Sequence, residues 1–313
     1  MRVIVTGGAG FIGSNICDAL LGGGHTVCVV DNLNERGGGR REHVPKDVRF
    51  DEVDIRDREQ LDRVFSEFRP EVVCHQAAQT SVVRSSREPA YDASVNVLGT
   101  VNVLDAAVAI GARKCIFAST AATYGNVESL PATEETPQRP LSPYGMTKLI
   151  GEQYLTFYAR QRGFEYTILR YGNVFGPRQN PQGEGGVVAI FTGRFVGKQP
   201  VQINSDGEQS RDFTYVGDVA RVNVLALDRG ANEAYVVGTG KKTTVNAIYK
   251  ALVQITGFEA PVVAGPNRPG EARENYCDPA KADAQLGWRA EVDLISGLEK
   301  TLAYNAKVLA QVG

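Results

Sequence analysis

The chain has 313 residues and a formal net charge of −2, with 34 Lys and Arg against 36 Asp and Glu. The basic residues form no long run, which argues against nucleic acid as a partner, because phosphate binding requires clustered positive charge. No apolar run is long enough to span a membrane. The five cysteines are scattered and form no metal-ligating pair, so we expect neither disulfides nor a bound metal, and a reduced, cytoplasmic location.

A strand pattern opens the chain at residues 2–6 and is followed at once by a glycine-rich turn and a helical pattern at residues 14–21. The first glycine permits a sharp bend, the middle one lets the backbone approach a pyrophosphate, and the last allows the helix to pack closely on the strand. Free N–H groups at the start of the helix then face the pyrophosphate. This order of elements predicts a dinucleotide site formed by Gly7, Gly10, Phe11, Ile12 and Gly13.

The second strand pattern, residues 26–30, ends in Asp31. A carboxylate about 20 residues beyond the glycines accepts hydrogen bonds from the adenosine ribose and repels a 2′-phosphate, so the sequence favours NAD over NADP. Asn32 is expected beside the ribose or simply in a turn. A third strand pattern leads to Asp54 and Ile55, which we expect against the adenine; the acid is alternatively suited to the start of the next helix.

A helical pattern at residues 57–68 leads to a fourth strand pattern at residues 71–75. Small side chains beyond this strand would let a nicotinamide riboside lie close to the backbone. The segment concerned is Gln76, Ala77, Ala78 and Gln79. We expect His75 to be a structural residue rather than a base. The long helical pattern at residues 91–110 carries Asn96, which either holds the loops near the cofactor or is exposed.

A fifth strand pattern runs into Thr120, and a helix is expected over residues 143–162, with Ser142 as its N-cap and proline at its first position. Tyr144 and Lys148 are four residues apart and therefore share one face of this helix. An ammonium group favours the ionised form of a nearby phenol, and the Thr120 hydroxyl can bridge to a substrate oxygen. These groups predict a catalytic site that removes a proton from an alcohol or returns it. The alternative is an amphipathic helix with a surface lysine.

Strands and helices alternate up to a sixth strand pattern at residues 166–170, which predicts an α/β fold with a doubly wound, Rossmann-type parallel sheet. The ligand site is then expected at the carboxyl ends of the strands. Beyond this point the chain becomes rich in loops. We expect residues 1–171 to form an NAD-binding domain to which residues 215–240 return, and residues 172–214 and 241–313 to form a smaller substrate-binding lobe. Helices are expected in the second half at residues 187–196, 216–227 and 244–255, and strands at residues 200–203 and 234–237.

With these residues in place, the chain resembles the extended short-chain dehydrogenase/reductase family and, within it, the bacterial NAD-dependent UDP-glucose 4-epimerases. The resemblance covers nearly the whole chain. Besides the motifs above, it rests in the second half on residues 170–178 (RYGNVFGPR), 211–213 (RDF) and 268–271 (RPGE).

The resemblance implies a role for each matching residue. Tyr144 would be the base, Lys148 would bond the nicotinamide ribose and lower the pKa of Tyr144, and Thr120 stands where relatives often carry serine. Tyr171 would join the cofactor site. A UDP-hexose would be held at its diphosphate by Arg211 and Arg268, for which the alternative is a surface salt bridge. The further substrate residues that the resemblance implies are Asn173, Val187, Val188, Gln202, Asn204, Glu271 and Arg178.

The resemblance also implies the reaction: hydride leaves C4 of a UDP-glucose or UDP-galactose, and returns to the other face of a 4-keto sugar. A dehydratase is disfavoured, because related dehydratases carry an Asp-Glu pair after the threonine and this chain has Ala121 and Ala122. A 4-epimerase of UDP-N-acetylglucosamine or UDP-glucuronate, a UDP-sugar decarboxylase and a non-catalytic NAD-binding protein remain as alternatives.

Two further expectations follow from the resemblance. Relatives pair through two helices that correspond to residues 91–110 and 144–162, both of which carry apolar residues on more than one face, so we expect a homodimer; ordinary packing on the sheet is the alternative. Asn275 borders the expected sugar pocket, where a bulky tyrosine would exclude an N-acetyl group. A small residue there predicts some activity on N-acetylated substrates, unless Tyr276 fills the space.

Overall fold

A parallel sheet lies at the centre of the computed structural model, which describes residues 1–34, 37–181, 186–266 and 273–312. Among these residues the sheet has seven strands in the order β11-β6-β5-β4-β1-β2-β3. The strands are β1 (Arg2–Thr6), β2 (Thr26–Asp31), β3 (Arg49–Glu52), β4 (Val72–His75), β5 (Lys114–Thr120), β6 (Glu165–Tyr171) and β11 (Glu233–Val237). The predicted doubly wound sheet is confirmed. The strand order reverses between β1 and β4, which is where ligands bind in folds of this kind.

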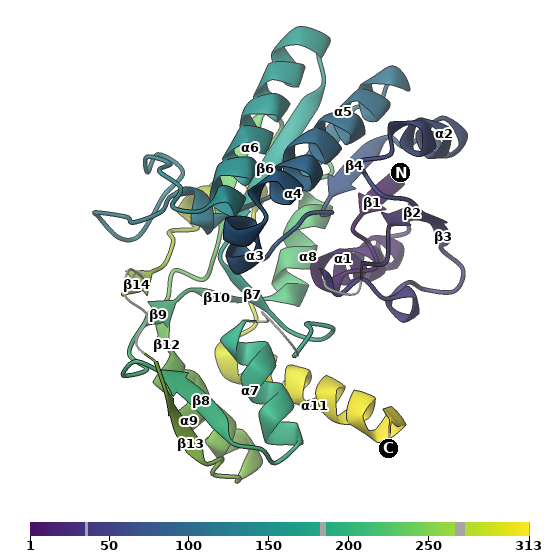
Figure 1. Ribbon diagram of the computed structural model, residues 1–313. Coiled ribbons are helices and arrows are strands. Elements are labelled where there is room, and N and C mark those ends of the chain that lie inside the picture. The colour runs from purple at the N-terminus through teal and green to yellow at the C-terminus, as the bar shows by residue number, and fades with distance from the viewer. Residues whose placement is uncertain (35–36, 182–185, 267–272, 313) are drawn as a thin grey trace.

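Helices cover both faces of the sheet (Figure 1). Val3 and Val5 of β1 pack into the cluster beneath α1 (Phe11–Gly22) and α8 (Val216–Leu225), whereas Ile4 packs into the opposite cluster. That second face carries α2 (Arg58–Phe68), α5 (Thr100–Ala109) and α6 (Pro143–Arg162). Because successive side chains of a strand point to opposite faces, burial on both sides explains why these strands read as unbroken apolar runs.

Local signals explain where α6 begins and ends. The side chain of Ser142 accepts a hydrogen bond from the N–H of Gly145, and proline occupies the first helical position. The helix ends at Gly163, whose φ of 63° is left-handed. The helical pattern expected at residues 91–110 is present as α4 (Pro89–Ala93), a π-helical turn η3 (Ser94–Gly99) and α5 in direct succession.

The remaining elements gather at the carboxyl end of the sheet and in the lower part of Figure 1. They include α7 (Val187–Val196), α9 (Val245–Thr256), α11 (Leu294–Val312) and the parallel pair β8 (Val201–Asn204) and β13 (Val262–Gly265), which enclose an apolar core of their own. The shorter elements are α3 (Val82–Arg87), β7 (Asn173–Phe175), β9 (Ser210–Arg211), β10 (Phe213–Tyr215), β12 (Thr243–Thr244) and β14 (Glu274–Asn275). In contrast, α10 (Ala280–Leu286) packs beside β11 in the core cluster that also holds α1 and α8. The expected division into two domains stays a prediction.

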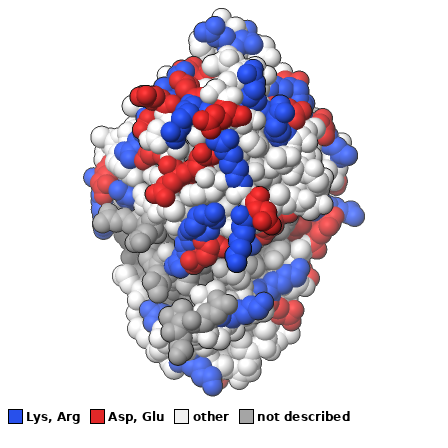
Figure 2. All heavy atoms as spheres, turned by 90° about the vertical axis from the view of Figure 1, so that its right-hand side faces the viewer, with Lys and Arg blue, Asp and Glu red and all other residues white. Residues whose placement is uncertain are grey.

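Positive and negative side chains are interspersed over the face shown in Figure 2. This mixture suits the small net charge of −2. None of the helices in the described ranges has the length and hydropathy that a membrane crossing requires.

Candidate functional site

The glycine-rich turn between β1 and α1 leaves room for a ligand on one side only. A Cβ on Gly13 would lie 2.2 Å from the carbonyl oxygen of Gly7, and a Cβ on Gly7 would lie 2.6 Å from the backbone nitrogen of Ala77. A Cβ on Gly10 would meet only the Gly7 oxygen, at 3.2 Å. Within the described chain no side chain caps α1, so the N–H groups of its first turn, at Phe11 and Ile12, can receive an anion. This cradle fits the pyrophosphate of NAD.

Asp31 lies beside this turn at the carboxyl end of β2. Its carboxylate accepts hydrogen bonds from the backbone N–H groups of Ala9 at 3.0 Å and Leu33 at 2.8 Å. Burial raises the pKa of this carboxyl group, and the two hydrogen bonds oppose that rise. Each carboxylate oxygen keeps a further lone pair, so the group can still accept a bond from a ribose hydroxyl.

Asn32 and Asp54 are brought together by the ends of β2 and β3. The amide of Asn32 donates to Asp54 at 2.9 Å, and Arg56 forms an ion pair with Asp54 at 2.7 Å. The Arg56 hydrogen bonds lower the pKa of Asp54 to about 2. Asp57 caps α2, and Asp54 lies three residues before this cap, so both roles expected for Asp54 stay predictions. Ile55 is buried and packs against Gly99.

Gln76 connects β4 to β6 and α8. The hydroxyl of Tyr171 donates to the Gln76 amide oxygen at 3.4 Å and accepts from Asn223 at 2.8 Å, while the Gln76 amide nitrogen donates to Asn223 at 3.3 Å. Tyr171 is buried, and burial raises its pKa. Ala77 and Ala78 follow, both partly buried, beyond the carboxyl ends of the paired strands β1 and β4.

His75 has a structural position, and its neighbours determine its tautomer. Thr100 donates its hydroxyl proton to the carbonyl of Asn96, so the Nε2–H of His75 donates to Thr100 at 3.0 Å. Nδ1 then accepts from the Thr6 hydroxyl at 2.7 Å, and Thr6 accepts from the N–H of Ala77 at 3.3 Å. Burial lowers the pKa of His75 to about 3, so the ring stays neutral and holds the backbone of Ala77 in place.

A buried polar network continues from Gln79. Asn96, on the π-helical turn, accepts from the N–H of Gln79 at 2.8 Å and donates to its carbonyl at 2.9 Å. This is the loop-holding role expected for Asn96, and the residue is not exposed. The network also contains Asp92, which sequence reasoning missed, with bonds to Gln79 at 2.6 Å and to Thr147 at 2.7 Å. Its spacing of four residues from Asn96, on one helical face, was the available signal.

Thr120, Tyr144 and Lys148 meet where β5 ends against α6. The side chains of Tyr144 and Thr120 are hydrogen-bonded, and Lys148 donates to the carbonyl of Ala118 at 2.8 Å. Burial lowers the pKa of Lys148 to about 8. Burial raises the pKa of Tyr144 to about 12, which outweighs the lowering by the Thr120 hydrogen bond. Desolvation disfavours the phenolate here, and the lowering of the Tyr144 pKa by Lys148 stays a prediction for the NAD-bound protein.

Glu152 and Arg170 form a buried pair next to Thr120, Tyr144 and Lys148. Sequence reasoning missed this pair as well. Arg170 pairs with Glu152 at 2.7 Å, and Glu152 also accepts a hydrogen bond from Ser119, the residue before Thr120. Arg170 belongs to the motif at residues 170–178, and a buried strand that ends in an arginine also signals a buried partner.

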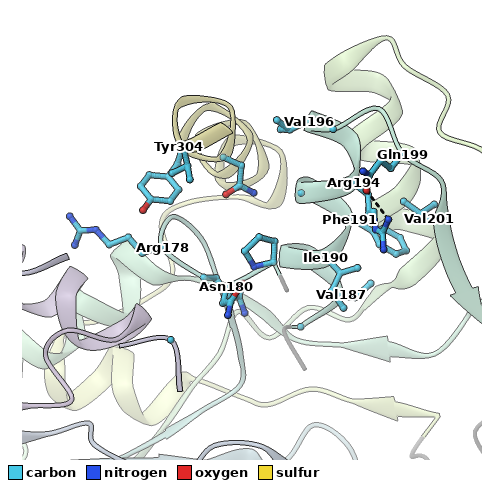
Figure 3. A pocket seen from close by; sticks show the side chains of 18 of the residues that line it. Arg178, Asn180, Val187, Ile190, Phe191, Arg194, Val196, Gln199, Val201 and Tyr304 are labelled. Carbon is cyan, nitrogen blue, oxygen red and sulfur yellow. Dashed lines mark hydrogen bonds between the residues drawn. The ribbon is translucent and has the colours of Figure 1, made fainter. Parts of the chain in front are cut away.

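A cavity of about 1260 Å³ lies between α7, α11 and the loops beyond β6. Figure 3 shows Val187 and Ile190 on α7 and Tyr304 on α11 around it. The expected substrate residues in its wall are Asn173, Arg178, Val187, Gln202, Asn204 and Arg211. The described wall of this cavity does not include the corner at Tyr144.

Four of the expected substrate residues are not in that wall, and two more lie outside the described residues. Val188 is 1% exposed and packs in the apolar core, because it is turned by one helical position from Val187. Asn275 is on β14, where its register places it beside Arg211 of β9 rather than in the wall. Thr120, at the end of β5, and Tyr144, on α6, likewise lie outside the wall. Arg268 and Glu271 lie outside the described residues.

A model of the NAD dependent epimerase/dehydratase family matches residues 3–238 of this chain. The chain belongs to this family. The expected NAD dependence and epimerase type are thereby confirmed, and the cradle described above suits that cofactor.

Known proteins resemble the chain over nearly its whole length. The UDP-glucose 4-epimerase of Thermotoga maritima, solved with UDP-glucose, is 47% identical with a TM-score of 0.95, and covers 99% of this chain and 100% of its own. That of Thermus thermophilus, solved with NAD, is 44% identical with a TM-score of 0.92 and coverages of 97% and 99%. The UDP-glucose 4-epimerase of Mycolicibacterium smegmatis is 38% identical over 97% of this chain and 98% of its own.

Proposed function

We propose that this protein is a 4-epimerase of UDP-hexoses whose substrates are UDP-glucose and UDP-galactose. The observation that carries the proposal is the meeting of Thr120, Tyr144 and Lys148 beside an NAD cradle, in a chain that resembles UDP-glucose 4-epimerases along nearly its full length. The hydroxyl groups of Thr120 and Tyr144, next to the amine of Lys148, suit proton transfer on an alcohol.

In the proposed reaction, Tyr144 takes the proton from the C4 hydroxyl and later returns it. NAD, when bound, supplies a reversible acceptor for the hydride of C4. Thr120 hydrogen-bonds both the reacting hydroxyl and Tyr144, and Lys148 holds the nicotinamide ribose from the same helix. The 4-keto sugar turns within the site and accepts hydride on its other face. The protein contributes placement and charge to this sequence.

For the nucleotide end of the substrate, we assign Asn173, Arg211, Val187, Gln202 and Asn204, which share the wall of one cavity. Arg211 is partly buried there, and its planar guanidinium is well shaped to bind a diphosphate in two places. Arg268 at the diphosphate and Glu271 at the uridine ribose remain part of this proposal on the strength of their motif.

Rival activities differ in what they require of the site. A dehydratase requires an acid that expels a hydroxyl, but the short helix after Thr120 begins with Ala121 and Ala122. A 4-epimerase of another UDP-sugar or a UDP-sugar decarboxylase uses the same proton and hydride transfers. A non-catalytic NAD-binding protein has no use for a buried lysine beside a tyrosine and a threonine.

The proposal is tested by incubating the purified protein with UDP-galactose and measuring the formation of UDP-glucose, with UDP-N-acetylgalactosamine and UDP-glucuronate in parallel. Conversion of UDP-galactose supports the proposal. Conversion of another sugar alone reassigns the substrate. Tight NAD binding without conversion of any of them favours the non-catalytic protein.

We also propose that two copies pair through η3, α5 and α6. Leu98 and Phe157 on these helices are 62% and 57% exposed, although both are large and apolar. Burying such a face on a second copy removes it from water. A mass equal to one chain in light scattering would refute the dimer. All five cysteines are buried free thiols, which suits the cytoplasmic location that we propose.

A further inference from the structure

Asp92 joins three segments around the proposed catalytic residues. One carboxylate oxygen accepts hydrogen bonds from the side-chain amides of Gln79, at 2.6 Å, and Asn96, at 3.2 Å. The other accepts from the hydroxyl of Thr147 at 2.7 Å. Thr147 directly precedes Lys148 on α6, and Gln79 ends the loop beyond β4 that we expect beside the nicotinamide. One carboxylate thus connects α4, this loop and α6.

Neutral groups, rather than a cation, donate the hydrogen bonds that the carboxylate of Asp92 accepts. Its side chain is fully buried, and the three donors that contact it are all neutral. Buried carboxylates are costly unless they are hydrogen-bonded, and most are paired with a cation. Both oxygens of the carboxylate accept hydrogen bonds from these partners, whereas an asparagine would keep one acceptor oxygen and turn an NH2 group toward the other side.

We propose that Asp92 is a positioning residue for the epimerase reaction, which fixes the helix carrying Tyr144 and Lys148 against the loop beyond β4 and acts on both side chains through its charge. This inference rests on the proposed function. Asp92 raises the pKa of Lys148 against the burial that lowers it, and it raises the pKa of Tyr144 together with burial. Removing the charge therefore moves both pKa values downward.

The other groups that face this pair are few among the described residues. Glu152, one turn along α6, also raises the pKa of Lys148 and is itself paired with Arg170. His75 on β4 faces Lys148 and is neutral. Thr120 on β5 lowers the pKa of Tyr144 through its hydrogen bond. Asp92 is thus the charged group that acts on both Tyr144 and Lys148.

The test compares the holoenzyme with three variants. Asp92→Asn keeps the shape and loses the charge, whereas Asp92→Glu keeps the charge and stretches the hydrogen bonds. Asp218→Asn is the control, because Asp218 on α8 is a buried carboxylate on the other face of the sheet. It pairs with Arg221 and accepts from the N–H groups of Glu291 and Val292. The pH dependence of kcat is measured for each at equal NAD content.

In Asp92→Asn we expect both limbs of the pH profile to move to lower pH by about one unit, since a nearby charge shifts a pKa by at least that much. In Asp92→Glu we expect a lower kcat with unmoved limbs, and in Asp218→Asn a loss of stability with unmoved limbs. A purely structural role would lower the rate in Asp92→Asn without moving either limb, and that result would overturn the proposal.

A second readout separates this inference from the proposed function. Tyrosine is labelled at its ζ-carbon, the Tyr144 signal is identified by its loss in Tyr144→Phe, and its titration is followed by NMR in the NAD-bound protein. We expect a lower midpoint in Asp92→Asn than in the wild type. If no UDP-sugar is converted, the proposed function fails, yet this titration still decides whether Asp92 acts on Tyr144: an unchanged midpoint refutes it.

Discussion

Glu152 and Arg170 form a buried ion pair beneath the proposed catalytic corner, with 2.7 Å between Oε2 and Nη2. Their side chains are only 5% and 8% exposed. Glu152 follows Lys148 by one helical turn and also accepts a hydrogen bond from Ser119, the residue before Thr120. The pair therefore holds the end of β5, which carries Thr120, against the helix that carries Tyr144 and Lys148.

Breaking this pair should destabilise the protein strongly. Glu152→Gln leaves the buried guanidinium of Arg170 without its counter-charge, and we expect a loss of about 3–5 kcal/mol in the free energy of unfolding. The measurement is chemical denaturation. Glu128→Gln is the control, because the Glu128–Arg139 pair is exposed and contributes little. An equal loss of unfolding free energy in the two variants would show that the buried pair stabilises the protein no more than the exposed pair does.

Gly13→Ala should impair NAD binding. The new Cβ would lie 2.2 Å from the carbonyl oxygen of Gly7, so the turn that receives the pyrophosphate must open. We expect the purified variant to carry much less NAD and to bind added NAD more weakly. Gly22→Ala, near the end of the same helix, meets no atom within 4 Å and serves as the control. Unchanged NAD content in Gly13→Ala would contradict this account of the turn.

Tyr144→Phe removes the proposed base and keeps the ring. We expect kcat to fall by about 10²–10⁴-fold, the usual contribution of a positioned acid or base, with little change in bound NAD. Tyr166→Phe, on β6, is the control and should leave kcat unchanged. Turnover of Tyr144→Phe within about tenfold of the wild type would mean that another group moves the proton.

His75 should make the protein sensitive to mild acid. The pKa of His75 is lowered to about 3 by burial, and the unfolded chain has an ordinary histidine pKa near 6.5. Between these values the unfolded state binds the extra proton, so stability falls as the pH falls, by about 1.4 kcal/mol per pH unit. Urea unfolding at several pH values measures this slope. In His75→Gln we expect a shallower slope below about pH 6.5, and an identical slope would refute the assignment.

Asn275 should decide how well an N-acetyl group is tolerated. It lies on β14 in register with Arg211, and we expect its small side chain to leave room beside the sugar. Selectivity that arises only from imperfect contacts amounts to about 1–3 kcal/mol. We therefore expect some turnover of UDP-N-acetylgalactosamine in the wild type and less in Asn275→Tyr, with kcat/KM for UDP-galactose retained. An unchanged ratio of the two kcat/KM values would exclude Asn275 as the gatekeeper.

The features that the sequence predicted well are those encoded over a few neighbouring residues. The glycine turn, the Ser142 cap with the following proline, and the apolar pattern of α7 each act within one or two helical turns. Backbone conformation and capping depend on local sterics and hydrogen bonds, so the bounds of α7 agree with the prediction at both ends. The alternating strands and helices then restrict the topology to a right-handed, doubly wound sheet.

The tertiary structure alone decided which distant side chains meet. Asp92 and Thr147 are 55 positions apart, and Thr6 and His75 are 69 apart, yet each pair is hydrogen-bonded in the interior. The short strand β7 appears inside an expected loop because it pairs with β10. Burial around Tyr144 also raises its pKa, an effect that the spacing of Tyr144 and Lys148 does not encode. Local patterns carry no information on such partners or on desolvation, which arise only when the folded chain brings these segments together and excludes water.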